Sequence, residues 1–226
     1  PTITNIEEAR TLYLESGTKA IIAFGGGSAM DCAKVTGACI VKPNKPIHKM
    51  KGLLRICKKL PLLIAVLTTA GTGSETTLAA VITDSGAKHK YPINDFSLIP
   101  RYAVLDYHVT LGLPKNITTT TGMDALTHAI EGYTTKAAWE IPDMFHIEAI
   151  RLISENLRDA VANKPSGREG MALAQYIAGM GFSNVGLGID HSMAHTLSAH
   201  YDTPHGVACA MLLPISMEFN RDYTGD

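Results

Sequence analysis

Two pairs of potential metal ligands are each spaced four residues apart. Asp124 and His128 form one pair, in TGMDALTHAIEGY, and His191 and His195 form the other, in GIDHSMAHTLSAH. Residues four apart on a helix lie on one face, about one turn from each other, so each pair can share a single ion. One carboxylate with neutral imidazoles suits a divalent transition metal, iron or zinc, and leaves positions open for a substrate. The spacing therefore predicts a metal site in the second half of the chain.

The later histidines leave the full ligand set open. Four of the nine histidines fall within fifteen residues: His191, His195, His200 and His205. Spacing favours His191 with His195, but His205, which follows the turn at Pro204, is equally able to reach the ion. The residues alone do not decide which three of these histidines bind.

Two glycine-rich loops follow apolar runs. Gly25-Gly26-Gly27-Ser28 precedes a helical stretch, and TTAGTGSE occupies residues 68–75. Glycines let the backbone approach a phosphate, and the start of a helix offers free N–H groups and a positive dipole. The first loop lacks the GxGxxG fingerprint, and alone it is more often a structural joint. Two such loops at the carboxyl edge of a parallel sheet predict a cofactor site.

Asp31 and Lys34 lie three residues apart on the helix that follows the first loop, so both can face the same way. A surface ion pair and a role at the cofactor are equally open interpretations. We include Asp31 among the candidate cofactor contacts.

The elements that must position these loops alternate between helix and strand. Thr4-Asn5-Ile6-Glu7 has the pattern of a capping box, and Gly17 supplies a helix stop. A second helix is predicted over residues 29–41, and the apolar runs that predict strands are residues 20–24, 61–69, 79–83 and 102–106. Helices and strands that alternate through glycine-rich joints indicate an α/β layer with parallel strands.

The second half of the chain has helical periodicity and no convincing strand. The predicted helical stretches are residues 147–161, 171–185, 190–200 and 207–219. We therefore expect a boundary near residue 112, with a dinucleotide-binding α/β domain over 1–111 and a helical metal- and substrate-binding domain over 112–226. The chain begins almost directly with a helix and stops just after an apolar helical segment. We therefore expect the first domain to lack an N-terminal portion and the second a C-terminal one.

Composition excludes several classes of protein. The net charge of −1 over 226 residues argues against a nucleic-acid binder, and the basic stretch over residues 42–59 is interpreted as a surface loop. The cysteines lack CxxC spacing, which favours reduced thiols in a cytoplasmic protein: Cys32, Cys39, Cys57 and Cys209. Because no apolar run reaches the ~18 residues that span a bilayer, we expect no membrane segment.

Four motifs occur together and in order: GGGSAMDCAK, TTAGTGSE, TGMDALTHAIEGY and GMGFSNVGLGIDHSMAHTLSAHYDTPHG. Together they resemble the iron-containing (group III) alcohol dehydrogenases, in particular the branch of lactaldehyde reductases and propanediol and butanol dehydrogenases. The resemblance runs along essentially the whole chain. It implies an incomplete Rossmann-like α/β part with a parallel sheet, followed by an all-helical metal-binding domain, as in the dehydroquinate synthase-like architecture.

The resemblance also implies roles for individual residues. The implied metal ligands are Asp124, His128, His191 and His205, and His195 is implied as a proton relay near the substrate. The pyrophosphate contacts map to Gly25, Gly26, Gly27 and Ser28. Thr68, Thr69 and Thr72 match the second cofactor loop, and Lys90 corresponds to a ribose-side contact.

The expected activity is hydride transfer between NAD or NADP and a small alcohol or aldehyde, with Fe²⁺ or possibly Zn²⁺ as Lewis acid. The resemblance further implies a cytoplasmic homodimer or larger homo-oligomer, with no nucleic-acid or membrane partner. Alternatives are an enzyme like glycerol dehydrogenase or dehydroquinate synthase on the same fold, and a non-catalytic nucleotide- or metal-binding module. The paired aspartate and histidine of DALTH count against the glycerol branch, and a metal-free maleylacetate reductase would lack the full histidine set.

Overall fold

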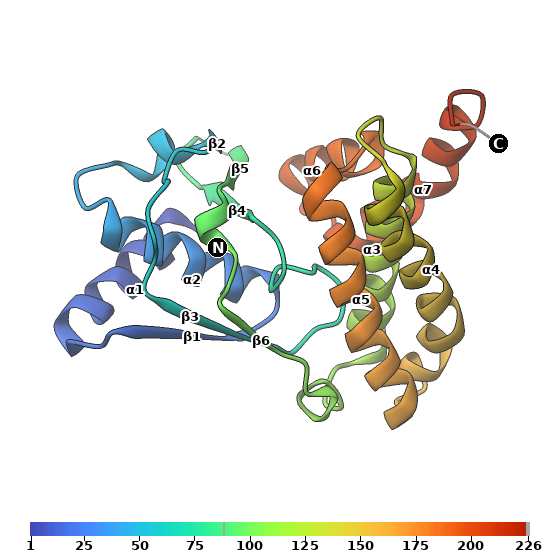
Figure 1. Cartoon of the computed structure of the whole chain (residues 1–226), viewed down its shortest axis with the longest axis horizontal. Helices are drawn as coiled ribbons and strands as arrows, with labels where there is room; N and C mark the ends of the chain where they lie inside the picture. The colour runs from blue at the N-terminus through green and yellow to red at the C-terminus, as the bar shows by residue number, and fades with distance from the viewer. Residues whose placement is uncertain (88, 225–226) are drawn as a thin grey trace. The chain divides into compact units, whose positions relative to one another are not determined.

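A computed structural model describes residues 1–87 and 89–224 of the chain (Figure 1). The chain divides into two units: Pro1–Thr68 with Ser74–Leu105, and Thr69–Gly73 with the residues from Asp106 onward. This division falls between Leu105 and Asp106, a few residues before the expected boundary near residue 112. It also assigns the middle of the second glycine-rich loop to the helical unit. The functions that we assigned to the two parts remain predictions.

The first unit contains a parallel sheet with the strand order β1-β3-β6. Its strands are β1 (Ala20–Gly25), β3 (Leu62–Leu67) and β6 (Tyr102–Val104), and β1 aligns with β3 in register along its whole length. Helix α2 (Gly27–Val41) follows β1 directly. The prediction of parallel strands is confirmed for these three runs.

A second sheet has the order β2-β5-β4, and it corrects the prediction for residues 79–83. β4 (Ala79–Asp84) pairs antiparallel with β5 (His89–Asn94), which pairs in parallel with the short β2 (Gly52–Leu53). The run over residues 79–83 is therefore a strand, but not a member of the parallel sheet. The reason is the short connection to β5, because parallel neighbours need a crossover of a dozen residues or more.

Helix α1 (Ile3–Ser16) begins earlier than its sequence pattern predicts. Thr2 is the N-cap, and it forms a capping box with Asn5, so the assignment of this role to Thr4 and Glu7 is wrong. Thr2 has the extended backbone that an N-cap requires, whereas Thr4 already lies inside the helix. The helix stop is confirmed, since Gly17 has φ 64°, in the left-handed region.

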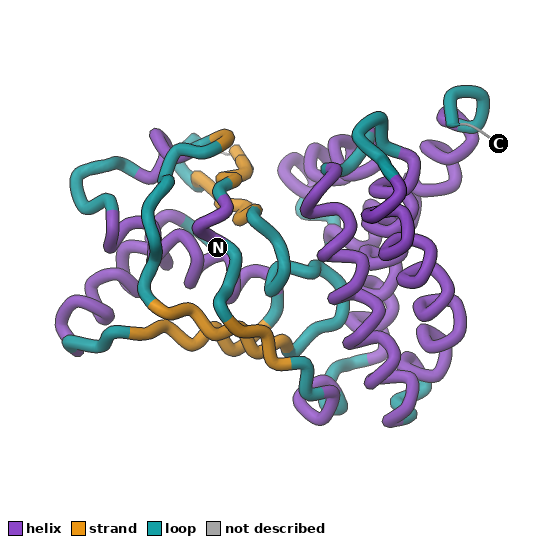
Figure 2. Tube along the Cα trace, viewed as in Figure 1, coloured by secondary structure: helices purple, strands orange, loops and turns teal. Residues whose placement is uncertain are grey.

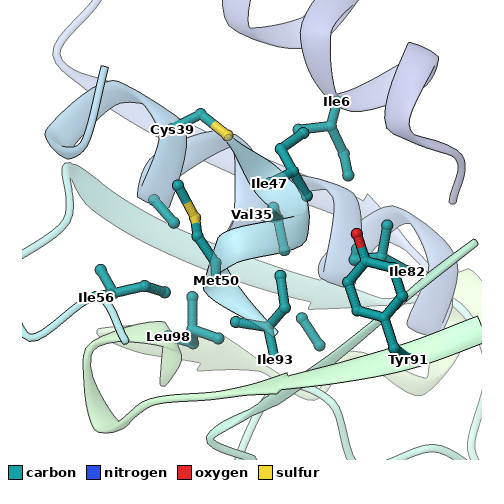
Figure 3. Close-up of a cluster of buried hydrophobic side chains, with 12 residues drawn as sticks. Ile6, Val35, Cys39, Ile47, Met50, Ile56, Ile82, Tyr91, Ile93 and Leu98 are labelled. Carbon is teal, nitrogen blue, oxygen red and sulfur yellow. The ribbon is translucent and has the colours of Figure 1, made fainter. Parts of the chain in front are cut away.

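The core of the first unit lies between helices α1 and α2 and the second sheet (Figure 3). Ile6 of α1 and Val35 of α2 pack there with Ile82 and Ile93 of the sheet, and all four are buried. The basic stretch over residues 42–59 also contributes to this core, through its apolar members Ile47, Met50 and Ile56. The interpretation of that stretch as a surface loop therefore does not hold for these three buried residues. Three short 3₁₀ helices complete the elements before α3: η1 (Ile47–Met50), η2 (Phe96–Leu98) and η3 (Tyr107–Thr110).

The second unit is helical, and it contains no strand within the described residues (Figure 2). Its helices are α3 (Lys115–Thr134), α4 (Glu140–Val161), α5 (Pro165–Val185), α6 (Ile189–Tyr201) and α7 (His205–Asn220). α3, α4 and α5 pack against one another, and α7 packs on α3 and α6. The predicted fold class, a parallel α/β part followed by an all-helical part, is confirmed. Across the described part of the chain, no helix has the length and apolar character needed to cross a membrane.

Candidate metal centre

Three helices of the second unit supply the residues of the candidate metal centre. Asp124 and His128 lie one turn apart on α3, as the sequence predicts, and His191 lies in the first turn of α6. His205 is the first residue of α7, and Cys209 follows it by one turn. Because α7 packs on both α3 and α6, these side chains meet inside the helical unit.

The ligand atoms of Asp124, His191, His205 and Cys209 all lie within 4.8 Å of one another. Asp124 Oδ1 lies 3.5 Å from His191 Nε2 and 3.6 Å from His205 Nε2. Asp124 and His191 are buried, and His205 is partly exposed. Such spacings suit donor atoms that each lie about 2.0–2.3 Å from one shared ion, so these residues fit a divalent metal.

His128 lies beside this group of ligand atoms but is not a member of it. Its ring stacks on Phe182 and on His191, at centroid distances of 4.3 and 4.4 Å. Its Nδ1 is buried. Burial lowers the pKa of His128 to about 3, so the imidazole stays neutral, the form that binds a metal. The assignment of His128 as a ligand remains a prediction.

Glu131 supports the centre, and the sequence analysis missed it. Its Oε2 lies 2.6 Å from Nδ1 of His191, and its Oε1 accepts a hydrogen bond of 2.7 Å from the backbone N–H of Asp190. Glu131 therefore caps α6, whose N-cap residue Gly188 makes no side-chain cap of its own. Its position seven residues after Asp124, on the same helix face, is the signal that would have identified it.

The carboxylates and imidazoles of the centre stabilise each other's charged forms. Burial alone would raise the pKa of Asp124, but His128, His191 and His205 outweigh it and hold that pKa below its usual value. Burial alone would lower the pKa of His191. Its hydrogen bonds, of which the one to Asp124 has the largest effect, raise that pKa well above the usual value.

His195 and His200 differ in their relation to the centre. The ring of His195 stacks on that of His205, with centroids 4.8 Å apart, and its side chain is half-buried. His200 is exposed near the end of α6, beside Tyr201. Among the histidines that spacing left open, the structure groups His191 with His205.

The first glycine-rich loop lies where β1 and β3 end. Gly25 is the last residue of β1, Gly26 is the N-cap of α2, and the carbonyl of Gly25 accepts a hydrogen bond of 3.0 Å from the N–H of Thr68. A Cβ on Gly25 would lie 2.6 Å from the Cβ of Ala29, so only glycine fits this turn. The structure thus brings Gly25, Gly26, Gly27 and Ser28 next to Thr68, at the carboxyl edge of the parallel sheet.

Glycines of the second loop are explained by packing within the helical unit. A Cβ on Gly71 would lie 2.6 Å from the carbonyl oxygen of Thr121, and one on Gly73 would lie 2.8 Å from Cα of Gly179. The N–H of Gly73 also donates to Oε1 of Gln175 at 2.9 Å. Thr69 and Thr72, two predicted cofactor contacts, therefore belong to a segment that is held by helices α3 and α5.

Asp31 and Lys34 have structural partners, and the interpretation of the two as a surface ion pair is wrong. Lys34 is fully buried, and its Nζ donates to the carbonyls of Thr77 and Ala79, at 2.9 and 2.8 Å. Asp31 accepts hydrogen bonds from the hydroxyl of Ser74 and from the backbone N–H of Val81, at 2.8 and 2.9 Å.

Lys90 is half-buried on β5, opposite Thr83 of β4. Its assignment to the ribose side of the cofactor, like that of Asp31 to the cofactor, remains a prediction.

Comparison with known proteins identifies both units. The family model for iron-containing alcohol dehydrogenase matches residues 1–107, and that for the C-terminal part of the Fe-containing alcohol dehydrogenase family matches residues 118–225. Lactaldehyde reductase of Escherichia coli K12 is 46% identical over 100% of the chain and 59% of its own length. NAD-dependent methanol dehydrogenase of Bacillus methanolicus is 40% identical over 97% of the chain and 58% of its own length.

A solved structure gives the same result for the fold. Alcohol dehydrogenase from Oenococcus oeni is 44% identical, with a TM-score of 0.94 over 97% of the chain and 58% of its own length. The chain thus spans less than two thirds of the length of each of these relatives. The two family models together cover nearly all of the chain, and the chain belongs to the iron-containing alcohol dehydrogenase family.

Proposed function

We propose that the protein acts as a nicotinamide- and metal-dependent alcohol dehydrogenase, which transfers a hydride between NAD or NADP and a small alcohol or aldehyde. The observation that carries the proposal is the convergence of Asp124, His191 and His205 from three helices, in a chain of this family. The relatives named lactaldehyde reductase and NAD-dependent methanol dehydrogenase support a small substrate and NAD as the cofactor.

The metal centre would hold Fe²⁺ or Zn²⁺ through Asp124, His128, His191 and His205. When bound, the ion supplies Lewis-acid polarisation of the substrate oxygen. Glu131 orients His191, because its carboxylate faces Nδ1 and leaves Nε2 directed at Asp124. The buried, neutral imidazole of His128, which stacks on the ring of His191, supports its place in the ligand set.

Most of the proposed cofactor contacts lie in the two glycine-rich loops. The backbone N–H groups of Gly25, Gly26, Gly27 and Ser28 at the start of α2 would bind the pyrophosphate, as the N-terminus of a helix favours an anion. The remaining proposed contacts are Asp31, Thr68, Thr69, Thr72 and Lys90. The nicotinamide itself supplies the hydride.

His195 would move the proton that accompanies hydride transfer. Its imidazole is half-buried and stacks on that of His205, a position between the ligands and solvent. An unligated imidazole exchanges protons near neutral pH and suits the role of a relay.

Two substitutions test the proposal. Asp124→Ala should abolish retention of Fe²⁺ or Zn²⁺, measured by elemental analysis, and with it the oxidation of NADH or NADPH by small aldehydes. His195→Ala should keep the metal content, slow turnover by about 10²–10⁴-fold and shift its pH profile, because a general acid–base contributes on that order. Normal metal content and activity in the Asp124→Ala protein would refute the proposal.

A non-catalytic nucleotide- or metal-binding module is the alternative. It would bind the nucleotide and the ion with the same residues, yet show no turnover with any aldehyde before or after Fe²⁺ is added.

The family resemblance also underlies two further parts of the proposal, a homodimer or larger homo-oligomer and a cytoplasmic location. Light scattering of the purified protein tests the first of these.

A further inference from the structure

Cys209 is a buried thiol that faces the metal centre. It lies one turn after His205 on α7 and is 0% exposed. On one side it packs with Ala194 and Ala208 in a small apolar cluster. Its Sγ is directed to the other side, where it lies 3.7 Å from Nε2 of His205.

The sulfur lies at similar distances from the other donors of the group. Sγ of Cys209 is 3.7 Å from Oδ1 of Asp124 and 4.0 Å from Nε2 of His191. The distances between Asp124 and the two imidazoles are 3.5 and 3.6 Å. Five of the six distances among these four atoms are 3.5–4.0 Å and the sixth is at most 4.8 Å, so the atoms form an irregular tetrahedron.

That tetrahedron matches the size of a divalent metal site. With metal bonds of about 2.3 Å to sulfur and about 2.0–2.2 Å to nitrogen and oxygen, tetrahedral geometry places the donors about 3.3–3.6 Å apart. The three spacings of the sulfur exceed the upper of these values by about 0.1–0.4 Å, a difference that small movements of side chains supply. A sulfur atom, unlike the carbon atoms of an apolar side chain, can bind a metal ion.

We propose that Cys209 binds the same ion as Asp124, His191 and His205, as a thiolate. The inference deepens the proposed function, and it rests on that proposal only in requiring a divalent ion at this cluster. In the binding step the S–H proton leaves to water and a sulfur–metal bond forms, without a change in oxidation state. With His128, the remaining ligand of the proposed function, the donor set becomes three nitrogens, one oxygen and one sulfur, which favours Zn²⁺, Fe²⁺ or Co²⁺ over Mg²⁺ and Mn²⁺.

Cobalt provides a direct readout that does not depend on activity. Chelator-treated protein is titrated with Co²⁺ alone, while the near-ultraviolet absorption that is characteristic of charge transfer from thiolate to cobalt is recorded together with the visible bands of the ion. We expect this absorption to saturate at one Co²⁺ per chain. Calorimetry of the same titration gives the affinity.

Matched variants test whether the sulfur of Cys209 gives this absorption. Cys209→Ala should lose the charge-transfer absorption and bind Co²⁺ at least about tenfold more weakly, whereas Cys209→Ser should lose the absorption with a smaller loss of affinity. Cys39→Ala is the control, because Cys39 is also buried but lies in the core of the first unit. It should retain both the absorption and the affinity.

Two results would overturn the proposal. Stoichiometric binding of Co²⁺ to the unmodified protein without a thiolate band would exclude Cys209 as a ligand and leave the proposed function intact. No binding of Co²⁺ at all would reject the metal centre together with Cys209. If the Cys209 variants do not fold, a protein with Cys32→Ser, Cys39→Ala and Cys57→Ser decides the question, since the absorption must persist when Cys209 is its only cysteine.

Discussion

His191 presents Nε2 to Asp124 because Glu131 holds its other ring nitrogen, at 2.6 Å. A carboxylate at Nδ1 fixes the tautomer of a histidine ligand, orients its ring and increases its basicity. Burial alone would raise the pKa of Glu131. Hydrogen bonds outweigh this effect, the one from His191 most of all, and hold that pKa below its usual value. Glu131 therefore remains an anion, and it acts on the metal centre as a positioning residue.

Glu131→Gln should weaken metal binding by about 10–100-fold, because substitution of such an outer-shell partner commonly costs this much. The measurement is a competition titration against a chromophoric chelator, with circular dichroism to confirm the helical content. Glu148→Gln is the matched control, as Glu148 is a partly exposed residue of α4 that pairs with Arg151. Equal metal affinities of the Glu131→Gln protein and the unmodified protein would contradict this role.

Spacing and family resemblance predicted three residues that the structure brings together, Asp124, His191 and His205. They did not predict Cys209, because the cysteines lack CxxC spacing with one another, although Cys209 follows His205 by four residues on α7, the same spacing as that of Asp124 and His128. The separation of His128 from the ligand group was also not predictable. It depends on the stacking of its ring on Phe182, and spacing along one helix does not contain that contact.

At the scale of elements, Lys34 connects helix α2 to the segment that enters β4. Its ammonium donates to the carbonyls of Thr77 and Ala79, and also to the hydroxyl of Thr77 at 3.2 Å. These contacts satisfy buried backbone oxygens where the second glycine-rich loop returns to the sheet. Burial lowers the pKa of Lys34 to about 8 from the usual 10.5.

The lowered pKa makes this connection dependent on pH. Between pH 8 and 10.5 the unfolded chain binds more protons at Lys34 than the folded chain, so the contribution of Lys34 to stability rises with pH. Relative to Lys34→Met, the unmodified protein should gain about 1–2 kcal/mol in free energy of unfolding between about pH 7.5 and 9.5. At the higher pH, the variant should be less stable by about 2 kcal/mol, because buried carbonyls lose their donor.

Urea denaturation at both pH values measures this difference. Lys115→Met, at an exposed lysine in the first turn of α3, is the control. Its free energy of unfolding should differ from that of the unmodified protein by the same amount at both pH values. A difference in stability between the unmodified protein and Lys34→Met that stays constant or narrows as the pH rises would show that burial does not lower the pKa of Lys34.

Element types were predictable where periodicity is strong, and partners and ends were not. The apolar run at residues 79–83 indicates a strand, but the connection to β5, and not the run itself, determines its antiparallel partner. α1 begins at Ile3 because Thr2 takes the extended backbone of an N-cap, and two threonines so close together look alike in the sequence. The buried His146 of α4 was also not recognised as a packing residue, although Gly132 and Gly181 leave the space that its ring fills.

At the scale of the whole molecule, the two units have separate hydrophobic cores. The cluster around Val35 and Ile82 belongs to the first unit, and the clusters around Ile153 and Ala194 belong to the second. The ligand atoms that lie within 4.8 Å of one another all come from the second unit. A bound ion should therefore stabilise the helical unit directly.

An ion that binds only the folded state stabilises it by RT ln(1 + [L]/Kd), about 2.7 kcal/mol at a free concentration of 100 Kd. Addition of Zn²⁺ to chelator-treated protein should therefore slow amide hydrogen exchange in peptides from α3, α6 and α7, since these helices contribute the ligands. Peptides from β1 and α2 serve as the internal control and should exchange at unchanged rates, because neither element contributes a ligand. The Asp124→Ala protein should show no slowing in any peptide. Slower exchange confined to β1 and α2, or equal slowing with Asp124→Ala, would place the ion elsewhere in the chain.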